Sequence, residues 1–180
     1  MRNLLVASLL ASIALFVWGF VFWPLTESHV TGHAVDEDAL RAALQEQLPA
    51  TGTYFLPSPQ DGIDIWHRRH VEGPITVIRH RAEGVEPITP SFFLRGWLFL
   101  FVAVLPMAWL MRRLARHLDS FGERVRLCMV IGLAMALFGE LRGAVWSLEP
   151  WGHHLLGGGF VLGAWTILGV VLGWLVDGSD

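Results

Sequence analysis

The sequence predicts a mainly α-helical membrane protein, with four transmembrane helices and a small α+β domain between the first and the second. Composition is the first observation behind this class: 53% of the 180 residues are hydrophobic and the mean hydropathy is +0.49, whereas soluble domains are about 45 to 50% apolar. The second is that the apolar residues gather in runs of about 20 residues, the length that a helix needs to cross a bilayer.

Residues 1–23 form the first predicted span. The apolar run from Asn3 to Trp23 is longer than the core of about 7 to 15 residues in a signal peptide. It also ends at Trp23-Pro24 rather than at a small-residue cleavage site. We therefore expect an uncleaved anchor.

Residues 24–91 are the predicted extramembrane domain. Asp36 suits the N-cap of an amphipathic helix that stops before Pro49. Residues 51–59 predict a short extended segment, and the β-branched residues 75–82 predict a strand. A domain of this size cannot bury a large core alone. We expect it to lean on the membrane helices or on a partner.

Residues 61–72 fit either a strand or a helix. Ile63 and Ile65 alternate as in a strand, but Asp61 suits a helix cap and Gly73-Pro74 is a strong helix terminator. We favour the helix.

Residues 92–180 hold three further predicted spans, at 92–111, 125–145 and 155–176. The loop 112–126 contains an excess of Arg over Asp119 and Glu123, which marks a cytoplasmic loop. Both termini are then cytoplasmic as well. In the inner membrane of a bacterium, residues 24–91 and the turn 147–154 face the periplasm.

Small residues follow one face of each of the last two predicted helices. At about 100° per residue the stripes are Gly132, Ala136, Gly139 and Gly143, and Gly159, Gly163, Thr166, Gly169 and Gly173. Helices in lipid associate through close backbone approach at such residues. The stripes predict a tight antiparallel helix pair; the alternative is that one groove receives a partner's helix, a lipid or a pigment tail.

Glu140 and Arg142 are charged residues inside the third predicted span. If the span begins at Arg126, Glu140 lies about 21 Å into a core of about 30 Å. Arg142 can extend to the headgroups, whereas Glu140 cannot reach as far. The wheel places Glu140 beside the small-residue groove, so we expect a donor from the fourth span or from a partner, with His153 or His154 as the first candidates.

No residue pattern predicts a metal site, a cofactor or a catalytic centre. Of the 8 His residues, only His117 lies on the cytoplasmic side, but no HExxH-type signature or cysteine pair accompanies the others. No His lies within an apolar run, where a haem ligand would be expected. The net charge of -3 argues against nucleic acid as a partner.

A family resemblance covers nearly the whole chain. The anchor, the acidic helix ending in LPATGTYFLP, the piece ending in EGP, the β-branched run and ITPSFFLRGWL, followed by the remaining spans, resemble an uncharacterised family of small bacterial inner-membrane proteins. The matching motifs, Gly52-x-Tyr54-x-x-Pro57 and Gly73-Pro74, are turns. The resemblance therefore implies topology and no activity.

These features favour a non-catalytic accessory or scaffolding subunit of a larger inner-membrane complex, such as a respiratory or photosynthetic one. The expected partners are other integral-membrane subunits and lipids. Two alternatives remain open: a small transporter or channel component that uses Glu140 and Arg142, and a membrane enzyme or metal-binding protein that uses the periplasmic histidines.

Overall fold

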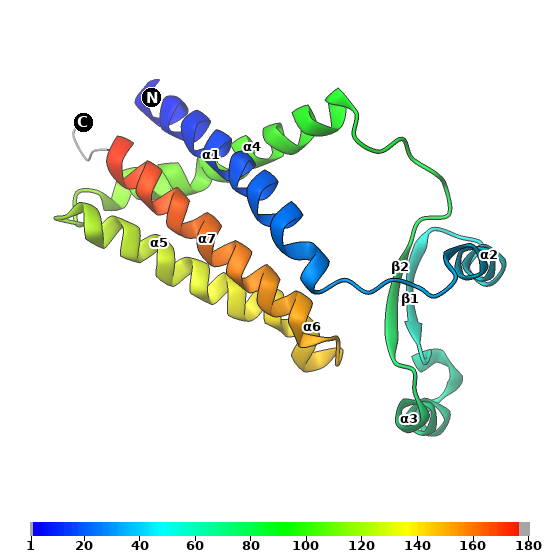
Figure 1. Cartoon of the computed structure of the whole chain (residues 1–180). Helices are drawn as coiled ribbons and strands as arrows, with labels where there is room; N and C mark the ends of the chain where they lie inside the picture. Colours follow the sequence, from blue (N-terminus) through cyan, green and yellow to red (C-terminus); the bar gives the residue numbers. More distant parts are fainter. Residues whose placement is uncertain (1, 177–180) are drawn as a thin grey trace.

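The computed structural model describes residues 2–176 and is mainly helical (Figure 1). It contains four helices that are long and apolar enough to cross a membrane, which confirms the mainly helical class and the predicted number of long apolar helices. The four are α1 (Arg2–Thr26), α4 (Pro90–Leu114), the continuous rod of α5 (Phe121–Met135), η3 (Ala136–Glu140) and α6 (Leu141–Trp146), and α7 (Trp151–Leu175).

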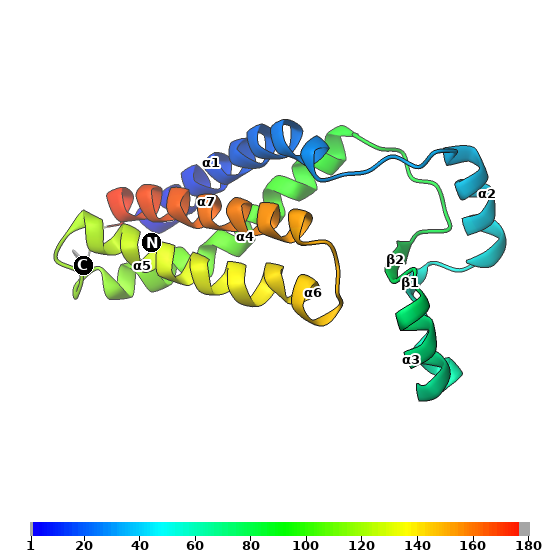
Figure 2. The ribbon, with the colours of Figure 1, turned by 60° about the horizontal axis from the view of Figure 1, so that its bottom comes forward.

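The long helix α7 lies at the centre of the bundle. It packs against α5 on one side and α1 on the other, and α4 packs mainly against α1. The start of α1, the end of α7 and the turn between α4 and α5 lie at one end of the bundle, whereas the small domain lies at the other end (Figures 1 and 2). The fold therefore separates an Arg-rich end from a domain-bearing end.

The buried core lies where α1, α4, α5 and α7 meet. It combines Met107 and Met111 of α4 with Cys128 of α5 and with Leu168 and Leu172 of α7. A stripe of small residues on α1 lets the bundle close here: Ala7, Ser8, Ala11 and Ser12 are all 0% exposed. The sequence analysis missed this stripe because it lies within a run that is apolar all round.

Two prolines lie inside helices. Helix α1 continues through Pro24 to Thr26, three residues beyond the predicted end at Trp23, and α4 is continuous through Pro106. Pro24 lies in the last turn of α1, so the hydrogen bond that its missing N–H would form is lost only at the end of the helix.

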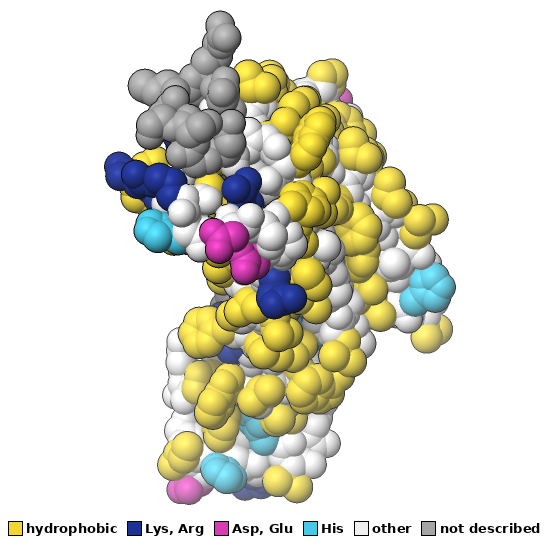
Figure 3. All heavy atoms as spheres, turned by 90° about the vertical axis from the view of Figure 1, so that its left-hand side faces the viewer, with side chains coloured by type: hydrophobic (Ala, Val, Ile, Leu, Met, Phe, Trp, Pro, Cys, Tyr) yellow, Lys and Arg dark blue, Asp and Glu magenta, His cyan; other side chains and the backbone are white. Residues whose placement is uncertain are grey.

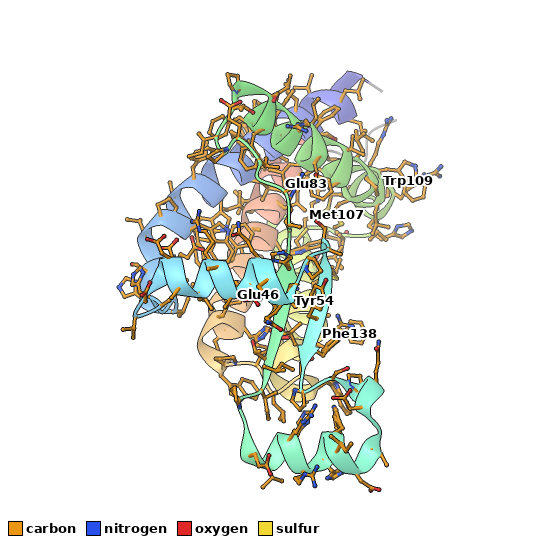
Figure 4. All side chains as sticks on the ribbon, turned by 90° about the vertical axis from the view of Figure 1, so that its right-hand side faces the viewer. Glu46, Tyr54, Glu83, Met107, Trp109 and Phe138 are labelled. Carbon is orange, nitrogen blue, oxygen red and sulfur yellow. The ribbon has the colours of Figure 1, made fainter. Side chains whose placement is uncertain are left out.

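The small domain contains α2 (Glu37–Gln47), β1 (Gly52–Leu56), η2 (Pro59–Asp61), α3 (Ile63–Glu72) and β2 (Thr76–His80). The two strands form an antiparallel ribbon in which Gly52 pairs with His80 and Leu56 with Thr76. Figure 4 shows α2 beside the strands, which carry Tyr54, and α3 beyond one end of them. Both expected helices and the expected strand are present.

Of the two predicted N-caps in this domain, Asp36 is confirmed and Asp61 is wrong. Asp36 caps α2, since its Oδ1 accepts a hydrogen bond from the Ala39 N–H at 2.9 Å. Asp61 does not cap α3, contrary to expectation: the helix starts after Gly62, whose φ is 93°. Asp61 therefore lies one residue too early and instead pairs with the guanidinium of Arg69.

The small domain has almost no buried core. Neither α2 nor α3 contains a buried residue, and of residues 27–89 only Pro57 is buried. Large apolar side chains are correspondingly exposed, among them Val71 at 88% and Ile63 at 67%. The described part of the chain thus leaves this domain largely uncovered.

Candidate functional site: the α5–α7 pair

The helices α5 and α7 approach one another so closely that several positions can hold only glycine. A Cβ atom added to Gly132 would lie 2.5 Å from Cβ of Trp165, and one added to Gly169 would lie 2.8 Å from Cβ of Cys128. Positions further along α5 meet positions earlier in α7: Cys128 meets Gly169, and Gly132 meets Trp165. The pair is therefore antiparallel.

The predicted stripes meet this contact only in part. Gly132, Ala136 and Gly143 face α7, and Gly169 and Gly173 face α5. The expectation is wrong for Gly139 and Gly159, because a Cβ at either would have nothing within 4 Å.

The middle of the α7 stripe is used differently. Gly163 packs against the Trp18 ring of α1 rather than against α5. The Trp18 Nε1–H also donates to the carbonyl of Phe160 at 3.1 Å, which joins α1 to α7.

The Thr166 hydroxyl donates to the carbonyl of Leu162 within its own helix at 2.7 Å. Two glycines outside the predicted stripe, Gly157 and Gly158, meet the α5 rod instead.

A π-helical turn at Ala136–Glu140 explains the departure of Gly139. The Leu141 N–H donates to the carbonyl of Ala136, five residues back. Such a turn inserts one residue, which rotates everything after it by about 100° relative to an unbroken α-helix. The stripe facing α7 then continues from Ala136 to Glu140 and to Ala144, which is 4% exposed. Glu140 has replaced Gly139 on the contact face.

Glu140 lies directly against α7 at Gly157. A Cβ at Gly157 would be 2.6 Å from Oε2 of Glu140, so the missing side chain makes room for the carboxylate. Among the described residues, no hydrogen bond to this carboxylate occurs. The expected donation from His153 or His154 is therefore wrong, because both rings have other neighbours.

His154 pairs with Glu149, which the sequence analysis did not single out. Its Nε2 lies 3.1 Å from Oε2 of Glu149, and the histidine is 9% exposed. The turn is tight: Leu148 has φ 54°, and the Glu149 N–H donates to the Gly143 carbonyl at 3.3 Å. The available signal was the position of Glu149 just before the α7 N-terminus, where the helix dipole favours a carboxylate.

Among the described residues, neither His153 nor Arg142 forms a hydrogen bond or an ion pair with Glu140. The His153 ring stacks on Trp23 of α1 with 6.4 Å between centroids. Arg142 is exposed on the outer side of α6. The structure thus does not bring Glu140, Arg142 and His153 together; it brings Glu140, Gly143, Gly157, Glu149 and His154 to one end of the helix pair.

The remaining histidines of this end are dispersed over the small domain. The His70 ring lies tilted against Trp66 with 4.0 Å between centroids, and His80 meets Tyr54 edge to face. Within residues 2–176 no group of three or more His, Cys, Asp or Glu side chains could hold a metal ion. The chemistry present at the helix pair is the Glu140 carboxylate, which can accept a hydrogen bond from an external donor, beside the histidine–carboxylate pair of His154 and Glu149.

Comparisons of the chain with protein-family models, with curated proteins and with solved structures find no match. The resemblance to a family of small inner-membrane proteins stays a prediction. A functional proposal for this chain therefore rests on its own sequence and geometry.

Gly132→Val should destabilise the protein, because the new side chain would overlap Trp165. Overpacking of this kind costs about 1 to 3 kcal/mol. The matched control is Gly159→Val, which enters open space. Thermal unfolding of both variants in the same detergent measures the difference, and equal losses of melting temperature would contradict the close contact.

Glu149 and His154 should be energetically coupled. A double-mutant cycle with Glu149→Ala and His154→Ala is expected to give a coupling free energy of about 1 kcal/mol, since each single variant leaves a largely buried partner unpaired. The same cycle with Glu140→Ala in place of Glu149→Ala should give less. A larger coupling of His154 to Glu140 would show that the histidine has the wrong partner.

Proposed function

We propose that this chain is a non-catalytic accessory or scaffolding subunit of a larger bacterial inner-membrane complex, and that its partners are other integral-membrane subunits. The observation that carries the proposal is the uncovered small domain. Its helices α2 and α3 bury no residue, although both carry large apolar side chains. Burying one such side chain contributes about 1.5 to 3 kcal/mol, so a partner surface that covers several of them would stabilise the domain substantially.

The position of the domain supports the same role. It is tethered on both sides, by α1 and by α4, and projects beyond the end of the spans (Figure 2). Extramembrane parts of neighbouring subunits would occupy the same layer. A domain held there by two helices can contact a partner without the loss of rotational freedom that a freely diffusing domain would suffer.

Charge supports a cytoplasmic location for the opposite end. Figure 3 views the end of the bundle that carries the α4–α5 turn and shows arginine side chains on it. The sequence supplies Arg112, Arg113, Arg116, Arg124 and Arg126 around the short α4–α5 turn. Short loops rich in Arg stay in the cytoplasm, so in this proposal residues 24–91 are periplasmic.

Purification in mild detergent should recover the chain together with stoichiometric membrane proteins, as mass spectrometry would show. A photo-crosslinking residue at Val71, 88% exposed on α3, should label a discrete partner. The matched control is the same residue at Phe138, 82% exposed on the membrane-spanning rod, where only diffuse labelling is expected. A lone, monodisperse protein without a discrete cross-link at Val71 would refute the proposal.

A second candidate function is a transporter or channel component, favoured by the π turn that directs Glu140 onto the helix contact without a donor. For the scaffolding function, Glu140→Gln should leave the co-purifying partners and the growth phenotype unchanged, as should the control Glu46→Gln on exposed α2. Loss of a flux or of growth in Glu140→Gln alone, with the protein still folded, would favour transport instead.

A further inference from the structure

A long groove lies on the outer surface of the α5–α7 pair. Its volume is about 550 Å³. Apart from one arginine it is lined by apolar side chains and a glycine, with Gly122, Arg126, Met129 and Leu133 from α5 and Leu162 and Val170 from α7. The groove therefore presents a hydrocarbon-like channel with a single cation.

The groove has the length of one bilayer leaflet. From Gly122 to Leu133 the helix rises by about 16 Å, at about 1.5 Å per residue. The hydrocarbon core of a bilayer is about 30 Å thick. The groove begins at the Arg-rich end of the bundle and runs inward from there. It thus covers the depth of the leaflet that surrounds this end.

Arg126 stands at the headgroup end of the groove and is exposed. Among the described residues it has no hydrogen-bond or ion-pair partner. Two nearby arginines are engaged: Arg124 donates to the carbonyls of Gly173 and Val176 at 3.1 Å each, and Arg113 lies over the Trp109 ring at 5.4 Å. Arg126 is therefore free to bind an external anion, and a guanidinium matches the geometry of phosphate oxygens.

We propose that this groove binds a phospholipid with a net negative headgroup, whose acyl chain lies along Met129 and Leu133 and whose phosphate contacts Arg126. The distribution of charge favours a lipid over a partner's helix. A phospholipid carries its anionic phosphate at one end of a hydrocarbon chain, and the groove has Arg126 at one end and apolar side chains along the rest. Apolar lining, leaflet length and charge all agree with this occupant.

Native mass spectrometry of the full chain tests the site. The protein is reconstituted with equal amounts of dioleoyl phosphatidylglycerol and dioleoyl phosphatidylethanolamine and then released from the membrane. The wild type should retain the anionic lipid, Arg126→Gln should retain it about tenfold less, and Arg126→Lys should keep most of it. The matched control, Arg142→Gln, removes an exposed arginine at the other end and should behave as the wild type.

A phosphatidylglycerol with a photoactivatable acyl chain supplies a second readout, expected to label Met129 and Leu133 above other lipid-facing residues. Because Arg126 is exposed and unpartnered, its variants should remain folded, which the melting temperature checks. Undiminished retention in Arg126→Gln, equal retention of both lipids by the wild type, or labelling spread evenly over all the helices would each overturn the proposal.

Discussion

The close approach of α5 and α7 is the contact on which the rest of the molecule depends. Helices in lipid gain little by burying apolar side chains against each other, because the lipid tails are equally apolar. What they gain is dispersion between closely packed backbones, and only glycine permits it where Gly132 meets Trp165 and Gly169 meets Cys128. The register set there decides which residues of α6 and of the following turn reach α7.

Polar interactions hold the same pair at its two ends. At the Arg-rich end, Arg124 of α5 donates to the last carbonyls of α7; at the other end, Glu149 precedes the first turn of α7 and pairs with His154. The positive charge of Arg124 and the negative charge of Glu149 suit the dipole of α7, whose C-terminus attracts a cation and whose N-terminus attracts an anion. Both clamps lie near the ends of the helix pair, so the middle of the contact stays nearly free of charge, with Glu140 as the exception.

The small domain is not held together by close helix packing of this kind, since neither α2 nor α3 buries a residue. Local backbone hydrogen bonds form its ribbon and its helix ends, including the Asp36 cap and the bond from the Gly73 N–H to the Arg69 carbonyl. These bonds do not provide a core, and apolar side chains such as Val71 stay exposed. The long helices thus share a buried core, whereas the small domain has almost none.

The sequence by itself determined the features that depend on local chemistry and on length. Apolar runs predicted the spans, Asp36 predicted its cap, and Gly73-Pro74 predicted the end of α3, because each rests on residues adjacent in the chain. The helix pair was predictable too, since small residues at helical spacing have few other uses in lipid.

Only the tertiary structure decided which face of each helix meets the next helix and which side chains contact one another. A helical wheel assumes a constant rotation per residue, so it could not anticipate the π turn that exchanges Gly139 for Glu140 on the contact face. Nor could it say that Gly163 receives Trp18 of α1, or that His154 turns to Glu149 across a bend. Those outcomes follow from which surfaces fit when the helices close together, a property of the whole bundle rather than of any segment.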